Sequence, residues 1–429
     1  MAVQQDAVVT NTVVIGGGHA GISMSVVLKA RGIQHVVLEK ARTLEQWRSN
    51  RWDSFKLNTT VDYSLIYGQK PDPENGFSGK QESLKPAKML GFWEAYIQET
   101  GVKVREHTEV VSVDDGDNES VRYVVSVESQ DGGPTTYHAR NVIACSGTYQ
   151  KPRIPEELAT KIPAHIKQVR VGTYKNIDDS LNDGGVLVVG GGQTGFQIGE
   201  EIVRSGRKVV VCTSMVPGSL RSYRGEDIFY WMDRIGFLSM PIQALSVPEM
   251  RFNRIPVTGN DHAISPHSMA REGAILVGSL EKVEGDELQF KDNLKEHVRF
   301  CDESYSTLAP RIEGYLEKTG TAGEYPPPEK EPEWEPHEPL LNDSPILKMN
   351  MNDEGITNVF WATGWGADFS FLKCGNLVDE MGPAGRPLTC DASKPGFFYL
   401  GFPWLRTLNS ANIQGHHADA LYIADQLTE

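Results

Sequence analysis

Two glycine-rich loops in the sequence have the spacing that binds the diphosphate of a dinucleotide. In the first, "TVVIGGGHAGISMSVVLKARG", Gly16, Gly18 and Gly21 form a G-x-G-x-x-G frame between an apolar run and an amphipathic stretch. The first glycine permits a tight turn, the second lets the backbone approach a diphosphate, and the third lets a helix pack on a strand. The N-terminus of that helix then receives the anion.

An acidic residue strengthens this interpretation of the first loop. Glu39 ends the next apolar run, "HVVLE", 18 residues after Gly21. A carboxylate at this distance accepts hydrogen bonds from both hydroxyls of a ribose. The first loop is therefore predicted to bind FAD. The alternative is a structural turn followed by a surface glutamate.

The same frame returns in "GVLVVGGGQTGFQIGEEIVRSGRKVVVCTS", where Gly190, Gly192 and Gly195 repeat it. The same step of 18 residues from Gly195 reaches Thr213, so the acid is absent. A carboxylate would repel a ribose 2′-phosphate, whereas a hydroxyl with nearby arginines would accept one. The second loop is therefore predicted to bind NADPH, and its expected contacts are Gly190, Gly192, Gln193, Thr194, Gly195, Thr213, Ser214, Arg221 and Arg224. The alternative for the two arginines is a surface or ion-pair role.

The elements that must position these loops are a strand before each loop and a helix after it. At 429 residues the chain is long enough for roughly two to three domains. Two copies of the strand–loop–helix unit predict an α/β protein with two Rossmann-like dinucleotide-binding domains, the NADPH domain inserted into the FAD domain. The expected boundaries are 1–158 for the first part of the FAD domain, 159–345 for the NADPH domain with a helical insertion, and 346–429 for the C-terminal part of the FAD domain.

Composition and charge exclude several classes of function. The chain is 39% hydrophobic and 23% charged, without a run of about 18 apolar residues that would span a bilayer. The first eleven residues lack the basic start and apolar core of a secretory signal, so a cytoplasmic location is expected. The formal net charge is −15 and no cluster of Lys and Arg with aromatic residues occurs, which excludes nucleic acid as an expected partner.

The five cysteines stand far apart in the sequence, without the spacing of a zinc site or a redox Cys-x-x-Cys pair. They are predicted to be buried and unreactive, and no metal is expected. A pyridine-nucleotide disulfide reductase or ferredoxin reductase would share the two-domain layout. A disulfide reductase, however, needs a redox cysteine pair.

Several stretches carry a resemblance to the class B flavin-dependent monooxygenases, the group of flavin-containing monooxygenases, N-hydroxylases and Baeyer–Villiger enzymes, and most of all to their bacterial single-component members. "EQWRSNRWDSFKLNTT" is similar to the segment after the FAD ribose acid, "NVIACSGTYQKPRIP" to the exit from the FAD domain, and "ITNVFWATGWGADFSFL" to the return into it. The resemblance implies that Trp47 and Arg48 pack around FAD and that Asn58 approaches the flavin edge. It also implies cofactor contacts at Thr363, Gly364, Ile413 and Gln414.

One motif differs from the family pattern. The fingerprint before the second domain has Phe-x-Gly, a histidine and an aromatic residue, whereas "PAHIKQVRVGTYKN" keeps only Tyr174 and has Arg170 at about the place of the histidine. This difference leaves the subgroup, and with it the substrate, open.

The resemblance implies a monooxygenase in which NADPH reduces the flavin, O₂ adds to give a flavin hydroperoxide, and one oxygen atom passes to a small-molecule substrate. N-hydroxylation of a small amine or amino acid, with aspartate as one example, is the leading hypothesis. A Baeyer–Villiger reaction on a ketone and a non-oxygenating FAD/NADPH oxidoreductase are the alternatives. Asn58 is expected to position the nicotinamide or the peroxide, and Arg406 a substrate carboxylate or FAD.

Two further sequence features give weaker support for a function. His267 and Arg271 are four residues apart, so that on one helical turn both would face an anionic substrate; the alternative is a solvated face. The proline- and glutamate-rich stretch 323–339 is expected to be an extended linker without a helix, with contact to a second copy in a homodimer as the alternative.

Overall fold

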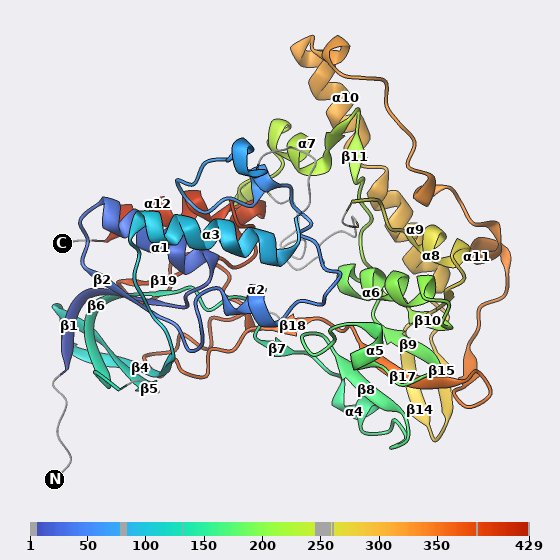
Figure 1. Cartoon of the computed structure of the whole chain (residues 1–429), viewed down its shortest axis with the longest axis horizontal. Helices are drawn as coiled ribbons and strands as arrows, with labels where there is room; N and C mark the ends of the chain where they lie inside the picture. Colours follow the sequence, from blue (N-terminus) through green and yellow to red (C-terminus); the bar gives the residue numbers. More distant parts are fainter. Residues whose placement is uncertain are drawn as a thin grey trace.

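The computed structural model describes residues 7–77, 84–130, 132–244, 259, 261–382 and 385–427. Two units, each built on its own sheet, lie side by side (Figure 1). Parallel strands with helices between them form the centre of both units. The predicted α/β fold with two dinucleotide-binding units is confirmed.

The first sheet has the order β3-β2-β1-β6-β5-β4, and β19 pairs with β6. Its parallel strands are β1 (Val8–Ile15), β2 (His35–Leu38), β3 (Val104–Arg105), β6 (Thr136–Ala144) and β19 (Phe397–Tyr399). Two antiparallel strands extend it, β4 (Thr108–Asn118) and β5 (Val121–Ser129). One side of this sheet is covered by α1 (His19–Ala30), α3 (Pro86–Thr100) and α12 (His416–Gln426) (Figure 1).

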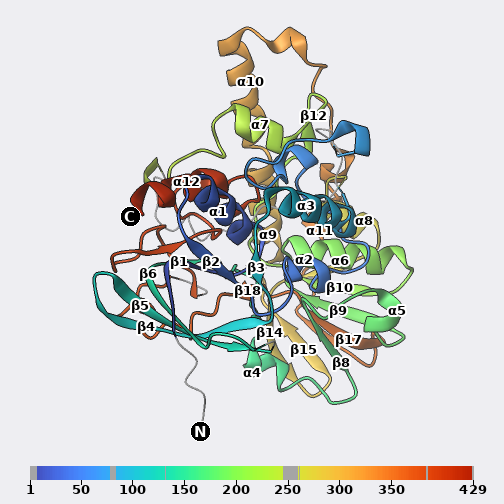
Figure 2. The same cartoon turned by 60° about the vertical axis from the view of Figure 1, so that its left-hand side comes forward.

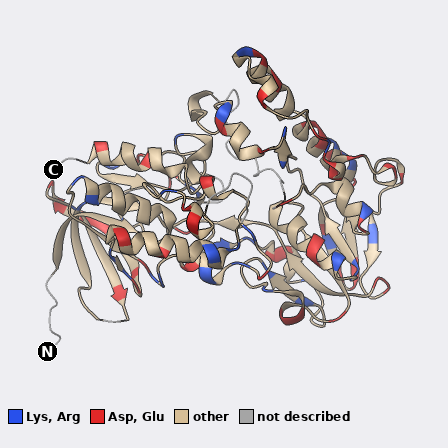
Figure 3. Cartoon of the chain, turned by 45° about the horizontal axis from the view of Figure 1, so that its top comes forward, with Lys and Arg blue, Asp and Glu red and all other residues tan. Residues whose placement is uncertain are grey.

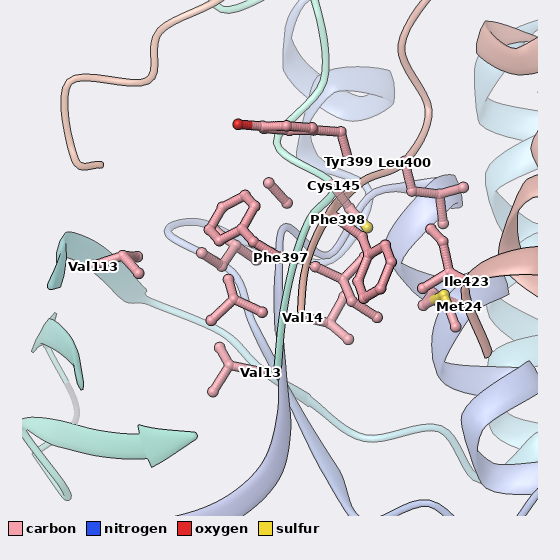
Figure 4. Close-up of a cluster of buried hydrophobic side chains, with 14 of the residues drawn as sticks. Val13, Val14, Met24, Val113, Cys145, Phe397, Phe398, Tyr399, Leu400 and Ile423 are labelled. Atoms are coloured by element: carbon pink, nitrogen blue, oxygen red, sulfur yellow. The ribbon is translucent and has the colours of Figure 1, made fainter. Parts of the chain in front are cut away.

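The core of the first unit joins the two ends of the chain. Figure 4 shows Val13 and Val14 of β1 beside Phe397 of β19, with Met24 of α1 and Ile423 of α12 on the helical side. Burying each such side chain contributes about 1.5–3 kcal/mol. The C-terminal segment is therefore an integral part of the first unit, although some 250 residues of chain separate β6 from β19.

The second sheet has the order β13-β10-β9-β17-β8, and all its pairings are parallel. Its strands are β8 (Lys167–Arg170), β9 (Gly185–Val189), β10 (Val209–Cys212), β13 (Ile275–Val277) and β17 (Ile356–Trp361), and α6 (Gln193–Arg204) follows β9. Because strands of a parallel sheet are covered on both faces, β9 and β10 consist almost entirely of apolar residues.

Strand β17 corrects the predicted boundary at residue 345. It pairs with β8 and β9, so residues 356–361 belong to the second sheet rather than to the C-terminal part of the first unit. The chain crosses back just after this strand, where β18 (Trp365–Gly366) pairs with β7 (Lys151–Pro152). An apolar run such as "ITNVFW" fits a buried parallel strand in either sheet, and only the pairing decides between them.

A small antiparallel sheet and several helices complete the second unit. The sheet contains β14 (Leu280–Glu284), β15 (Glu287–Phe290) and β16 (Lys348–Asn350), and a short hairpin contains β11 (Ser222–Tyr223) and β12 (Glu226–Asp227). The remaining helices of the chain are α2 (Glu45–Ser49), α4 (Glu156–Ala159), α5 (Ile177–Ser180), α7 (Ile228–Arg234), α8 (Pro266–Arg271), α9 (Leu294–Tyr305), α10 (Leu308–Thr319) and α11 (Glu338–Asn342). Short 3-10 turns occupy Val61–Tyr63, Pro73–Asn75, Ile242–Ala244, Ala322–Glu324, Pro332–Trp334 and Leu408–Ala411.

Helices α7 and α10 project from the body of the protein, and the proline-rich arm runs from α10 down the outer side of the second unit (Figures 1 and 2). The arm contains two 3-10 turns and α11, which corrects the expectation of a stretch without helix. Proline is tolerated at the first turn of a helix, and each of Pro332 and Pro339 lies at such a position. Trp334 is buried and stacks on Tyr305 with ring centroids 4.1 Å apart, so the arm is anchored.

Acidic and basic side chains are interspersed over both units (Figure 3). None of the helices among the described residues is long and apolar enough to cross a membrane. The prediction that a secretory signal is absent concerns residues 1–11, and the first six of these lie outside the described residues.

Candidate active site

A cavity of about 1790 Å³ runs between the two units and is lined by both glycine loops. Sites for a single small molecule usually measure about 300–1,000 Å³, so this cavity has room for more than one ligand. Its walls come from the ends of β1, β6, β9 and β10, where loops of parallel sheets commonly bind ligands.

The first glycine loop is a cradle that other residues would fill. A Cβ atom on Gly16, which has φ of +111°, would lie 2.5 Å from the carbonyl oxygen of Cys145. A Cβ atom on Gly21 would lie 1.9 Å from the carbonyl oxygen of Gly16. At Gly18, by contrast, a Cβ atom would meet nothing within 4 Å, because this residue faces the cavity. The loop therefore fits a diphosphate placed over Gly18 and the N-terminus of α1.

Glu39 closes the other side of this loop. Its Oε2 accepts a hydrogen bond from the N–H of Gly17 at 2.7 Å, and its Oε1 accepts one from the N–H of Ala41 at 2.9 Å. Burial raises the pKa of Glu39, and the two backbone N–H groups oppose this shift. A carboxylate has about four lone-pair sites, so Glu39 keeps acceptor capacity toward the cavity that it lines.

The second glycine loop repeats the first in detail. A Cβ atom on Gly195 would lie 1.9 Å from the carbonyl oxygen of Gly190, while Gly192 again faces open space. The hydroxyl of Ser214 accepts a hydrogen bond from the N–H of Gly191 at 3.3 Å. Ser214 therefore occupies the place that Glu39 has in the first loop, one residue later than the count along the sequence indicates.

The side-chain hydroxyl of Thr213 forms its hydrogen bonds inside the second unit. Its hydroxyl donates to the carbonyl of Val277 at 2.8 Å and lies 2.9 Å from Nδ1 of His297. Thr213 and Ser214 both line the cavity, as do Gln193 and Thr194 at the start of α6.

Arg221 and Arg224 do not line the cavity. Arg221 forms a buried ion pair with Asp227, and Arg224 is paired with Glu313 at 2.7 Å. The structure therefore gives both guanidinium groups carboxylate partners, which is the ion-pair alternative left open by the sequence.

Asn58 joins the two units at the cavity. Its Oδ1 accepts hydrogen bonds from the side-chain amides of Gln197 at 3.1 Å and Gln193 at 3.4 Å, both on α6. Its backbone carbonyl accepts one from Arg221 at 3.2 Å. Asn58 thus reaches from the first unit to the helix that follows the second glycine loop.

The aromatic segment after Glu39 contributes Trp47 to the cavity wall but not Arg48. Arg48 donates to the carbonyl of Thr43 at 3.0 Å and pairs with Glu94. Arg51, three residues further on, does line the cavity, with its guanidinium carbon 4.6 Å from the centre of the Trp47 ring. Both arginines belong to the stretch "WRSNRW", and the local sequence does not show which of them faces the cavity. Only the path of the backbone in the structure decides this.

Of the site residues predicted in the C-terminal part of the chain, some line the cavity and others do not. Thr363, Gly364 and Ile413 line the cavity, whereas Gln414 and Arg406 do not. The guanidinium of Arg406 lies 3.6 Å from Asp419 and stacks on the ring of Tyr422 at 4.1 Å. Both partners are on α12, so Arg406 braces this helix.

His267 and Arg271 share α8, as predicted, but they lie away from the cavity. His267 is 1% exposed, and its Nε2 lies 3.1 Å from Asp302. Arg271 donates to the backbone carbonyls of Pro332, Glu333 and Glu335. Both residues therefore hold the proline-rich arm against the second unit.

Three histidines meet where α1 and α12 begin. His19 lines the cavity and stacks on His416 with ring centroids 5.0 Å apart. Burial lowers the pKa of His19 to about 4, helped by the charges of Arg51 and His417, and it lowers the pKa of His417 to about 4. Burial also holds the pKa of His416 well below its usual value. These imidazoles are neutral at pH 7.

One wall of the cavity is apolar, and most of it comes from the helical insertion predicted in the second domain. It consists of Phe229, Met232, Phe237, Leu238, Met240 and Leu408. Two backbone hydrogen bonds join its halves, from the N–H of Leu408 to Met240 at 3.3 Å and from the N–H of Asn409 to Leu238 at 3.1 Å. Residues from both units thus close the cavity over the start of α12.

All five cysteines are free and buried, which confirms that part of the prediction. Cys145 and Cys212 line the cavity, and burial raises the pKa of both thiols. Within the described ranges, no group of three or more His, Cys, Asp and Glu side chains is placed to hold a metal ion.

Residues 13–232, about half of the chain, match the model of the pyridine nucleotide-disulphide oxidoreductase family. The chain belongs to this family. It is therefore an oxidoreductase, as predicted. It is 26% identical over 97% of its length to the uncharacterized oxidoreductase CzcO of Bacillus velezensis, of which it covers 99%. An indole-3-pyruvate monooxygenase of Oryza sativa is 26% identical over 53% of each chain.

Solved structures share the fold at low identity. A mutant flavin monooxygenase from Stenotrophomonas maltophilia has a TM-score of 0.65, 18% identity and 98% coverage of both chains. The bacillithiol disulfide reductase Bdr from Staphylococcus aureus has a TM-score of 0.58, 15% identity and 98% coverage of both chains. OTEMO in complex with FAD and NADP has a TM-score of 0.55 and 15% identity, over 98% of this chain and 84% of its own. The resemblance to flavin monooxygenases is confirmed at the level of the fold.

Proposed function

We propose that the protein is an FAD- and NADPH-dependent monooxygenase. The observation that carries this proposal is that two glycine cradles face one cavity and are joined there by Asn58. FAD would be held by Gly16, Gly18, Glu39 and Trp47, and NADPH by Gly190, Gly192, Gln193, Thr194 and Ser214. When bound and reduced, the flavin supplies the chemistry that activates O₂. The FAD and NADP named for OTEMO, which has the same fold, support this choice of cofactors.

The chain's own residues then have two tasks. The Oδ1 of Asn58 accepts from Gln193 and Gln197, so the side chain offers its amide N–H groups beside the second glycine loop, and these orient the nicotinamide amide without changing charge. The apolar wall defined above, which extends from Phe229 to Leu408, keeps water from the reacting atoms.

The substrate that fits this wall is an amine with an apolar body, which would be N-hydroxylated. Arg406, His267 and Arg271, the candidates predicted from the sequence for an anionic substrate, lie away from the cavity and have partners of their own, so none of them supports aspartate. Arg170, which replaces the histidine of the family fingerprint, also lies outside the cavity lining, so it gives no support to a Baeyer–Villiger reaction.

The test is oxygen uptake with NADPH in the presence of apolar amines, amino acids, ketones and disulfides. The expected result is a yellow protein that consumes O₂ and yields an N-hydroxylated amine in proportion to NADPH. Reduction of a disulfide with NADPH at the same rate with and without O₂ would contradict the proposal and favour a reductase. Oxidation of the ketones alone would keep the monooxygenase and refute the amine.

A further inference from the structure

Four guanidinium groups face the cavity without a carboxylate partner. Arg51, Arg153, Arg311 and Arg386 all line it, and none of them takes part in an ion pair within the described part of the chain. The Nε atoms of Arg51 and Arg386 are buried and have no hydrogen-bond partner. Because charged groups are seldom buried without a partner, such a cluster indicates an anionic ligand.

The charge of Arg51 is held in place by aromatic rings. Its guanidinium carbon lies 4.6 Å from the centre of the Trp47 ring, 5.1 Å from that of Phe55 and 5.7 Å from that of Tyr149. Its backbone carbonyl accepts a hydrogen bond from Lys175 of the second unit at 3.2 Å. Nη1 of Arg51 donates to the carbonyl of Asn50 at 3.5 Å, and the rings stabilise the cation while they leave its other N–H groups to a ligand in the cavity.

Arg51 lies beside the first glycine loop. The Trp47 ring that it covers is 6.0 Å, centre to centre, from the ring of His19, and His19 is the first residue of α1 after Gly18. The first turn of α1 has no acidic residue, and its cap residue has no side-chain hydrogen bond. The N-terminus of a helix supplies only about half a positive charge, whereas a dinucleotide diphosphate carries two negative charges. Arg51 is placed to supply the difference.

We propose that Arg51, assisted by Arg386, binds the diphosphate of a dinucleotide in this cavity, and that this dinucleotide is the one over Gly18. The proposal rests on the function proposed above. Arg386 comes from a segment more than 300 residues away in sequence, yet it lines the same cavity as Arg51 and, like Arg51, has a buried Nε atom without a hydrogen-bond partner. Two distant segments thus contribute one anion site, and a bidentate guanidinium is well suited to phosphate oxygens.

The test compares Arg51→Gln with Arg48→Gln, a matched control whose side chain is paired with Glu94 outside the cavity lining. FAD is removed from each protein, and the Kd for FAD is measured by the quenching of flavin fluorescence, alongside the Kd for NADP⁺ and the melting temperature of the apoprotein. Arg51→Gln is expected to weaken FAD binding by about 10-fold or more with an unchanged melting temperature, since a charge-assisted contact is lost. Arg51→Lys should recover part of this loss, and Arg48→Gln should bind FAD normally.

The other outcomes show whether the diphosphate that Arg51 binds belongs to FAD or to NADP⁺. Weaker NADP⁺ binding with normal FAD binding would support an Arg51 diphosphate site but overturn its assignment to the dinucleotide over Gly18. Normal binding of both by Arg51→Gln and by Arg51→Gln/Arg386→Gln would overturn the anion site while the proposed function stood. A wild-type protein that binds neither FAD nor NADP⁺ would instead refute the proposed function itself.

Discussion

The guanidinium of Arg221 donates a hydrogen bond to the backbone carbonyl of Asn58 at 3.2 Å, so a residue of the second unit supports Asn58 from behind. The same guanidinium is paired with Asp227, whose other oxygen accepts from the N–H of Phe229 at the start of α7. Glu331 of the proline-rich arm accepts from the N–H of Arg221 at 2.7 Å. Arg221 thus connects the arm, α7 and Asn58.

Replacing Arg221 should therefore affect coupling rather than the choice of nicotinamide cofactor. Arg221→Lys, which keeps the charge but loses the planar fork, is expected to release more hydrogen peroxide per NADPH consumed. The ratio of KM for NADPH to KM for NADH should not change, because Arg221 does not line the cavity. Arg224→Ala is the control, since its partner Glu313 has no contact with Asn58. A selective rise of KM for NADPH in Arg221→Lys would show that this arginine recognises the 2′-phosphate after all.

Asn58→Ala tests the amide itself. The variant should keep FAD and still be reduced by NADPH, but more hydrogen peroxide and less product should form, because the nicotinamide loses the amide donor of Asn58. The measurement is peroxide released per NADPH, with product quantified in parallel. Asn50→Ala is a control in the same segment, because the Asn50 side chain bonds to Gln46 and does not line the cavity. A fully coupled Asn58→Ala enzyme would refute the role of Asn58, and a colourless one would assign it to FAD binding.

The second and third glycines of the first frame should respond differently to a larger side chain. Gly18→Val is expected to fold but to lose FAD, because the new side chain enters open space over which the diphosphate lies. Gly21→Val should fail to fold stably, because its Cβ atom would lie 1.9 Å from the carbonyl oxygen of Gly16. Melting temperature and FAD content, measured together, distinguish the two effects. A yellow, FAD-replete Gly18→Val protein would overturn the assignment of the first loop.

The two glycine frames were predictable because they depend on local spacing, whereas the cavity position of Asn58 was implied by the family resemblance. A tight turn, a close approach and a helix start follow one another within a few residues, and the chain cannot place them differently. Glu39 belongs to the same local unit, since only a helix and a strand of ordinary length separate it from the loop.

The rest depended on where distant segments meet. The family resemblance implied Arg48, but the backbone of 45–52 directs Arg51 rather than Arg48 into the cavity. Thr213 lies at the same distance from its loop as Glu39, but its hydroxyl bonds to Val277, and Ser214, one residue further along, reaches the second loop instead. Arg406 follows a strand that ends near the cavity, yet Asp419 and Tyr422 attract its charge to α12. Such competition between partners is a tertiary effect that no local pattern reveals.

The histidine cluster predicts how stability depends on pH. The pKa of His417 in the folded protein is about 4, below its ordinary value of about 6.5, because burial disfavours the charged imidazole. A lowered pKa means that the unfolded chain binds a proton that the folded chain does not bind between pH 6.5 and about 4. The stability due to neutral His417 is therefore present above pH 6.5 and is lost as the pH falls through this window, by up to about 1.4 kcal/mol per pH unit.

His417→Phe removes this titration while it keeps an aromatic ring against Tyr67, which His417 contacts edge-on at 5.5 Å. The melting temperature of the wild type should fall more steeply than that of the variant between pH 6.5 and 4.5. The difference between the two curves is the quantity to measure, because His19 also has a pKa lowered to about 4, and Glu331 has a pKa raised to about 7 that acts in the opposite direction. Glu331 keeps its surroundings in the variant and cancels from the difference, whereas His19 stays buried and loses only the smaller effect of the His417 charge on its pKa. Parallel curves for the two proteins would show that His417 does not stay neutral in the folded state, and would remove the histidine cluster as a source of acid sensitivity.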